Sequence, residues 1–184
     1  MLDFNIKSLP VDVLSIAEGA GIRVIKNSDV MILGKGENGK SFCDGKIWVI
    51  IYDDKNPTEL SRYTIAHELG HILLGHELIY SPTDAVKGFT SKPRAENQAH
   101  MFALRLLCPA CVLWALNISS ADGIAKLCKV PLFASKQREK RLSELFIKNK
   151  FLTDPTEKQL FESFSDYIKL IKESEDKPKC TLKE

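Results

Sequence analysis

Residues 56–75 read NPTELSRYTIAHELGHILLG, and this stretch determines most of the fold that we expect. It opens with an asparagine, a proline and a nearby glutamate, a combination typical of a helix N-terminus in which Asn56 caps the first turn. The pattern stays helical until Gly75, which favours a C-terminal stop. We therefore predict one long helix over residues 57–74.

This helix carries two histidines, His67 and His71, with Glu68 directly after the first. Side chains four residues apart lie one helical turn apart on the same face, so both imidazoles can reach one metal ion. Glu68 then lies beside the open coordination position, where it can act as a general base. All four histidines of the chain fall within 34 residues. This clustering favours a metal site over the alternative, two hydrogen-bonded histidines on the surface of an amphipathic helix.

A catalytic zinc usually takes three protein ligands and a water, so a third ligand is needed. A metzincin would have glycine and histidine three and six residues after His71, where this chain has Leu74 and Glu77. We expect the third ligand to be Glu96, on a second predicted helix, which gives the His₂Glu set of thermolysin-like (gluzincin) enzymes. Glu77 and Asp84, in the polar loop between the two helices, are alternatives, although solvated charges are the more common role of such residues.

The rest of the chain predicts a small sheet before this helix and further helices after it. We expect a short helix at 10–18 and strands at 22–25, 30–33, 41–43 and 46–52, then helices at 93–107, 121–128, 132–148 and from Pro155 onward. Asp44-Gly45 predicts a hairpin with a two-residue type I′ turn. The apolar run 47–51 does not alternate, which predicts a strand covered on both faces. The last helix has an apolar stripe from Leu160 to Ile171, and the charged tail from Glu173 is expected to be frayed.

The composition is that of an ordinary globular protein, with 184 residues, 44% of them hydrophobic, 27% charged, and a net charge of +2. It excludes disordered, collagen-like and strongly basic nucleic-acid coat proteins. No apolar run approaches the roughly 18 residues needed to cross a bilayer, and the N-terminus lacks a secretory h-region. Five irregularly spaced cysteines favour reduced thiols. We therefore expect a cytoplasmic protein with no membrane partner.

Two other motifs have simpler explanations than a second site. Cys108 and Cys111 have CxxC spacing, but no second CxxC and no βαβ pattern accompany them, so we interpret them as buried thiols. Residues 136–150 carry six basic and two acidic side chains, a local charge of +4. Together with the turn at 129–131 this could form a helix-turn-helix reader of DNA. We favour a solvated helix face and do not expect nucleic-acid binding.

The stretches IAHELGHILL at 65–74 and ENQAHMFALRLLCP at 96–109 resemble the two signatures of the ImmA/IrrE family of metallopeptidases. In this resemblance Glu96 falls on the metal-ligand glutamate, and the coverage extends over about residues 10–148. His100 stands where the family usually has asparagine. It could hydrogen-bond the Glu96 carboxylate or replace it as ligand, and we favour the first. His76 follows the helix stop and is expected at the rim of the site or in solvent. Tyr80, His76 and His100 are candidates for an oxyanion donor.

The resemblance implies an α+β, zincin-like fold, with a small N-terminal β-sheet over the HExxH helix and a mainly helical C-terminal half. We expect residues 1–148 to form this metallopeptidase domain, and residues 149–184 to add an amphipathic helix packed on it and a tail. The implied function is a zinc-dependent endopeptidase with Zn²⁺ on His67, His71 and Glu96 and with Glu68 as catalytic base. Its implied substrate is a helix-turn-helix repressor of a phage or mobile element. The alternative is a non-catalytic, metal-containing regulator that acts by binding a partner or DNA.

Overall fold

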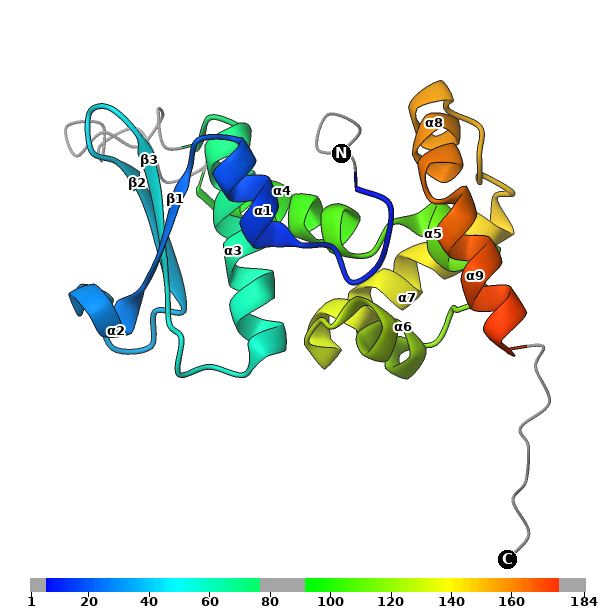
Figure 1. Ribbon diagram of the computed structural model, residues 1–184, viewed down its shortest axis with the longest axis horizontal. Helices are drawn as coiled ribbons and strands as arrows, with labels where there is room; N and C mark the ends of the chain where they lie inside the picture. The colour runs from blue at the N-terminus through cyan, green and yellow to red at the C-terminus, as the bar shows by residue number, and fades with distance from the viewer. Residues whose placement is uncertain (1–5, 77–91, 176–184) are drawn as a thin grey trace, which may run out of the picture.

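The computed structural model describes residues 6–76 and 92–175, and within these ranges the chain is an α+β protein (Figure 1). A three-stranded sheet lies at one end of the molecule, beside α3, and helices make up the C-terminal half. This confirms the predicted α+β class, with a small N-terminal sheet and a mainly helical C-terminal half. The elements in chain order are α1 (Val13–Gly19), β1 (Arg23–Lys26), α2 (Asn27–Val30), β2 (Gly39–Cys43), β3 (Trp48–Tyr52), α3 (Thr58–Leu73), α4 (Lys92–Leu107), α5 (Ala110–Ala115), α6 (Ala121–Cys128), α7 (Leu132–Ile147), α8 (Pro155–Ser163) and α9 (Ser165–Glu175).

The sheet has the strand order β1-β3-β2. β1 pairs with β3 in parallel, and β2 pairs with β3 antiparallel, with Ser41 opposite Ile50. Val49, Ile50 and Ile51 are each at most 4% exposed. Consecutive strand residues point to opposite faces, so β3 is covered on both faces, as its composition predicts. β2 lies directly against α3, and Gly39 permits this approach because a Cβ there would overlap Thr64.

Two predictions about this region are wrong. Residues 30–33 form no strand, because Asn27 begins the short helix α2 and its side-chain oxygen then accepts the amide hydrogens of Ile32 and Leu33. The hairpin is confirmed, but its turn is not the two-residue type I′ turn. The ladder ends at Cys43 opposite Trp48, and the Asp44 carboxylate binds the amides of residues 46 and 47 inside the longer loop.

The metal-site helix agrees closely with its prediction. α3 runs from Thr58 to Leu73, and Gly75 ends it with a positive φ of 71° and an amide hydrogen bond to the Ile72 carbonyl. The predicted cap is wrong, because Pro57 occupies the N-cap position and Asn56 instead donates its side-chain amide to Asn38. This contact fixes the start of α3 against the loop before β2.

The C-terminal helices share the core of the rest of the chain. Phe164 and Ile168 are buried in the same apolar cluster as Leu69 and Leu107. The single last helix that we predicted is two helices, α8 and α9, which break at Phe164 as this side chain enters the core. Asp154 caps α8 as its sequence predicts.

The remaining differences from the prediction concern one additional helix and the end of α9, and part of the predicted loop lies outside the described residues. The helix α5 was not predicted, and the first three residues of the predicted tail, 173–175, belong to α9. Most of the predicted polar loop, and with it Glu77, Tyr80 and Asp84, lies outside the described ranges. Within these ranges, no helix combines the length and the apolar character that a membrane crossing requires.

Candidate metal centre

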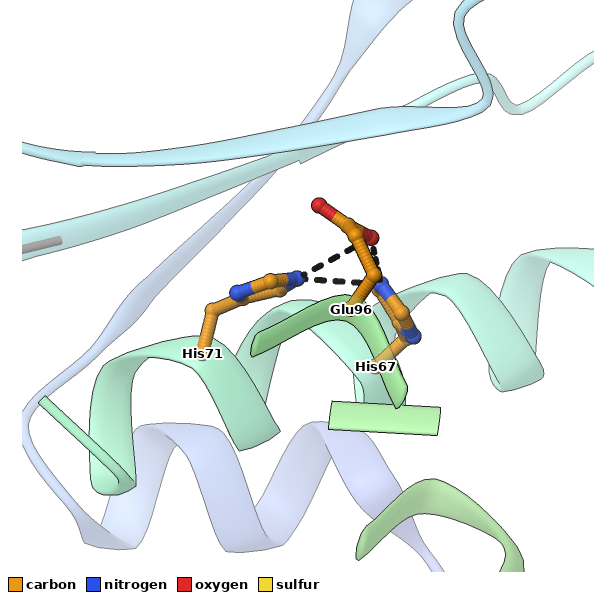
Figure 2. Close-up of side chains that lie close together, drawn as sticks. All are labelled: His67, His71 and Glu96. Atoms are coloured by element: carbon orange, nitrogen blue, oxygen red, sulfur yellow. Dashed lines mark hydrogen bonds and ion pairs between the residues drawn. The ribbon is translucent and has the colours of Figure 1, made fainter. Parts of the chain in front are cut away.

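The structure brings His67, His71 and Glu96 together, as the sequence analysis expects (Figure 2). The Glu96 Oε2 atom lies 3.3 Å from His67 Nε2 and 3.6 Å from His71 Nε2, and the two Nε2 atoms are 3.1 Å apart. Three ligand atoms about 2.0–2.1 Å from a tetrahedral zinc would be separated by about 3.4 Å. The donor set and its spacing therefore fit a zinc ion.

Close packing of α3 on α4 brings Glu96 to the histidines. Gly70, inside the HELGH sequence, faces α4, and a Cβ there would lie 3.0 Å from Phe102 Cδ1 and 3.2 Å from Ala99 Cα. These contacts are tighter than ordinary van der Waals distances. Glycine at 70 and alanine at 99 thus let the two helix backbones approach, and the first turns of α4 reach the metal-binding face of α3.

The surroundings of the two histidines favour neutral imidazole rings. Burial lowers the pKa of His67, with a further lowering from the neighbouring charge of His71, and burial also lowers the pKa of His71. The Glu96 carboxylate opposes both shifts. Neutral imidazole is the form that binds metals, because its unprotonated nitrogen offers a lone pair. The Glu96 side chain is 51% exposed, so the site opens to solvent on this side.

Glu68 lies at the edge of a cavity beside the metal ligands. The Ser41 hydroxyl, from β2, donates a hydrogen bond of 2.6 Å to Glu68 Oε2. The cavity has a volume of about 420 Å³ and is lined by Asn38, Gly39, Leu60, Tyr63, Thr64, His67, Glu68 and Phe133. Sequence reasoning missed Ser41, because no pattern marks a serine on a strand 27 residues away as a partner of this carboxylate.

His76 lies neither in solvent nor at the rim of the site, where we predicted it, but is buried behind His71. It is 4% exposed, and its Nδ1 atom lies 3.1 Å from His71 Nδ1 while its Nε2 atom lies 3.2 Å from Gln98 Oε1. The chain turns back after Gly75, which places this ring behind the ligand histidine. Helical spacing could not predict the contact between His76 and His71, because His76 follows the end of α3.

His100 also departs from its prediction. Its ring hydrogen-bonds the Tyr63 hydroxyl on one side and the Gln137 amide oxygen on the other. It therefore binds α3 and α7 rather than the Glu96 carboxylate, and Glu96 itself lies with the two ligand histidines. Burial lowers the pKa of His100. The asparagine-to-histidine departure from the family pattern is thus accompanied by a tyrosine and a glutamine that bind the new ring.

The cysteine pair lies in the interior. Cys108 and Cys111 are 0% and 1% exposed, and burial raises the pKa of the Cys111 thiol to about 11. Arg138, one of the basic residues of the segment 136–150, is 4% exposed and donates from Nε to the Cys108 carbonyl at 2.7 Å. Its burial removes it from the charged surface that this segment was considered to present.

An HExxH helix joined by a glutamate from the next helix, in an α+β chain, defines a class of metal-dependent peptidases. The family model of the IrrE N-terminal-like domain, Peptidase_M78, matches residues 17–138. This match spans more than half of the chain and includes all three candidate ligands and Glu68, and the chain belongs to this family. The resemblance found in the sequence is therefore confirmed. Among curated proteins, the search found no match to the chain. Membership implies a metallopeptidase.

Proposed function

We propose that this protein is a zinc-dependent endopeptidase with a zincin-like fold. The observation that carries the proposal is the convergence of His67, His71 and Glu96, whose ligand atoms all lie within 4.8 Å of one another. Glu68 lies beside them at an open cavity. The two histidines are held one turn apart by α3, and the carboxylate reaches them from α4. Zinc bound to these three side chains would supply a Lewis acid and lower the pKa of a coordinated water.

Glu68 would be the general base and then the general acid. Its carboxylate accepts a proton from the attacking water and delivers it to the leaving amine as the peptide bond breaks. Ser41 fixes one carboxylate oxygen from the adjacent strand. This hydrogen bond fixes the orientation of the Glu68 carboxylate at the edge of the cavity.

The family resemblance supports a narrower role for this activity. The resemblance to ImmA/IrrE proteins implies a cytoplasmic regulatory protease. Such a protease would cleave a helix-turn-helix repressor of a phage or mobile element and so derepress genes. The substrate to test is therefore a helix-turn-helix repressor, beginning with any that is encoded beside this gene.

The test compares the wild type with Glu68→Gln on that repressor, with products read by mass spectrometry. Glutamine keeps the shape but cannot accept the proton, so we expect cleavage to slow by about 10²–10⁴-fold. The zinc content, measured by elemental analysis, should stay at that of the wild type. A wild type that binds zinc and cleaves nothing would instead support a non-catalytic regulator, and undiminished cleavage by the variant would exclude Glu68 as the base.

A further inference from the structure

The two ligand histidines differ in what holds their second ring nitrogen. His71 presents Nε2 to the candidate metal site, and its Nδ1 lies 3.1 Å from Nδ1 of the buried His76. His67 also presents Nε2, but its Nδ1 is buried without a hydrogen-bond partner, the one such side-chain atom in the described part of the chain. One ligand ring is therefore anchored from behind, and the other is held only by packing.

Metal binding determines the direction of every hydrogen bond behind His71. A neutral imidazole carries one N–H, so a ring that offers the Nε2 lone pair to a metal must carry its proton on Nδ1. This N–H can only donate, and His76 Nδ1 must therefore accept. The proton of His76 then lies on Nε2, where it faces Gln98 Oε1 at 3.2 Å. An amide oxygen is an acceptor, so the chain of donors and acceptors closes without conflict.

We infer that His76 and Gln98 are positioning residues for the metal centre: they form a relay that fixes the tautomer and the ring orientation of His71. The inference rests on the proposed function, because it takes His71 as a metal ligand. Histidine ligands commonly donate their other N–H to a carboxylate, a backbone carbonyl or a water. Here a second histidine takes that place, and Gln98 in turn connects it to α4, the helix that supplies Glu96.

The arrangement makes α4 support the site twice. Glu96 approaches the ligand histidines from the open side, and Gln98, two residues later, holds His76 on the buried side. A shift of α4 would therefore move a ligand and the relay together. This coupling explains how Gln98, an exposed residue of α4, can matter to a metal site that it does not touch.

The first test measures zinc affinity by competition with a chromogenic chelator. We expect His76→Ala and Gln98→Met to raise the zinc Kd by about 10–100-fold, the usual cost of losing a partner of a ligand histidine. His76→Gln should recover part of the affinity, since its amide oxygen can accept from His71. The matched control is Asn97→Met, an amide-to-thioether change at the neighbouring exposed position, which should leave the Kd unchanged.

The second test needs no variant that might unfold. Long-range ¹H–¹⁵N NMR spectra of the zinc-loaded wild type report which nitrogen of each ring is protonated, and the chain has only four histidines. We expect His71 with its proton on Nδ1 and His76 with its proton on Nε2. Spectra of His76→Gln assign the His76 signals by their loss.

The outcomes separate this inference from the proposed function. A proton on Nδ1 of His76, or a wild-type zinc Kd in both His76→Ala and Gln98→Met, would overturn the relay and leave a zinc peptidase. A wild type that binds no zinc would overturn the proposed function, and the relay with it. Weakened zinc binding in the two variants but not in Asn97→Met, together with the expected tautomers, would support the relay.

Discussion

Two groups of side chains in this protein have the chemistry to bind zinc, and their surroundings act on them in opposite ways. The histidine group is His67, His71 and Glu96, between α3 and α4, and among the described residues its ligand atoms are the set that lies close enough together to share one ion. The thiol group is Cys108, Cys111 and Cys128, three buried free cysteines in the helical interior. Burial favours the neutral form of any ionisable group. Neutral imidazole is a metal ligand, whereas neutral thiol is not, because zinc binds the thiolate.

The pKa shifts follow this rule. Burial lowers the pKa of both ligand histidines, which keeps their lone pairs available at neutral pH. Burial raises the pKa of Cys111 to about 11, while a hydrogen bond with Cys108, followed by burial, raises that of Cys128. Burial thus keeps the imidazoles of the histidine group in the form that binds a metal, and keeps the thiols of Cys111 and Cys128 protonated. Residue type alone would have allowed both.

The strongest test of this contrast removes one member of each group. His67→Ala deletes a proposed ligand, so the loss of zinc affinity should exceed the roughly 100-fold that loss of a ligand's partner costs, and peptidase activity should disappear with it. Cys111→Ser should leave the zinc stoichiometry at the wild-type value. Chelator competition on the purified variants measures both. Loss of zinc in Cys111→Ser, with the fold intact by circular dichroism, would show that the metal binds the thiol group and not the histidine group.

We expect a smaller effect on the stability of the metal-free protein, whose free energy of unfolding should depend on pH. The pKa values of His67, His71 and His100 are lowered by burial, so the unfolded chain binds protons first as pH falls below about 6.5. The free energy of unfolding should therefore decrease from pH 7.5 to 5.5. The raised pKa of Cys111 acts in the opposite direction, because the unfolded thiol ionises from about 8.5 upward, and stability should decrease again as pH rises.

Urea unfolding at a series of pH values measures the free energy of unfolding on both sides of its maximum, which we call the acid arm and the alkaline arm. His100→Gln should flatten the acid arm, and Cys111→Ser should flatten the arm between pH 8 and 9.5, below the range in which lysine titrates. A loss of the acidic pH dependence in Cys111→Ser, or of the alkaline pH dependence in His100→Gln, would contradict the opposite effects of burial on buried imidazoles and buried thiols.

The sequence predicts best what depends on spacing within one element. The positions of His67, Glu68 and His71 follow from helical geometry, and Glu96 follows from the second family signature. The contacts of Ser41 and His76 could not be predicted in this way, since both arise where segments separated in sequence pack together. Gly75 marks the end of α3, but it does not show that the next residue turns back toward the ligand.

The incorrect predictions have a shared physical cause, which is competition from a contact that the local pattern does not contain. The apolar residues 30–33 suggest a strand, yet the Asn27 side chain binds two of their amides and prevents the pairing. The apolar stripe of the last helix continues across Phe164, but burial of that side chain breaks the helix in two. Periodicity reports which faces are apolar, and not where the backbone must bend to bury them.

X-ray absorption at the zinc edge tests the central claim most directly, because nitrogen, oxygen and sulfur neighbours differ in distance from the ion. We expect one zinc per chain with only nitrogen and oxygen neighbours at about 2.0–2.2 Å, including the imidazole pattern of two histidines. A sulfur shell near about 2.3 Å would place the metal on cysteines and contradict the account.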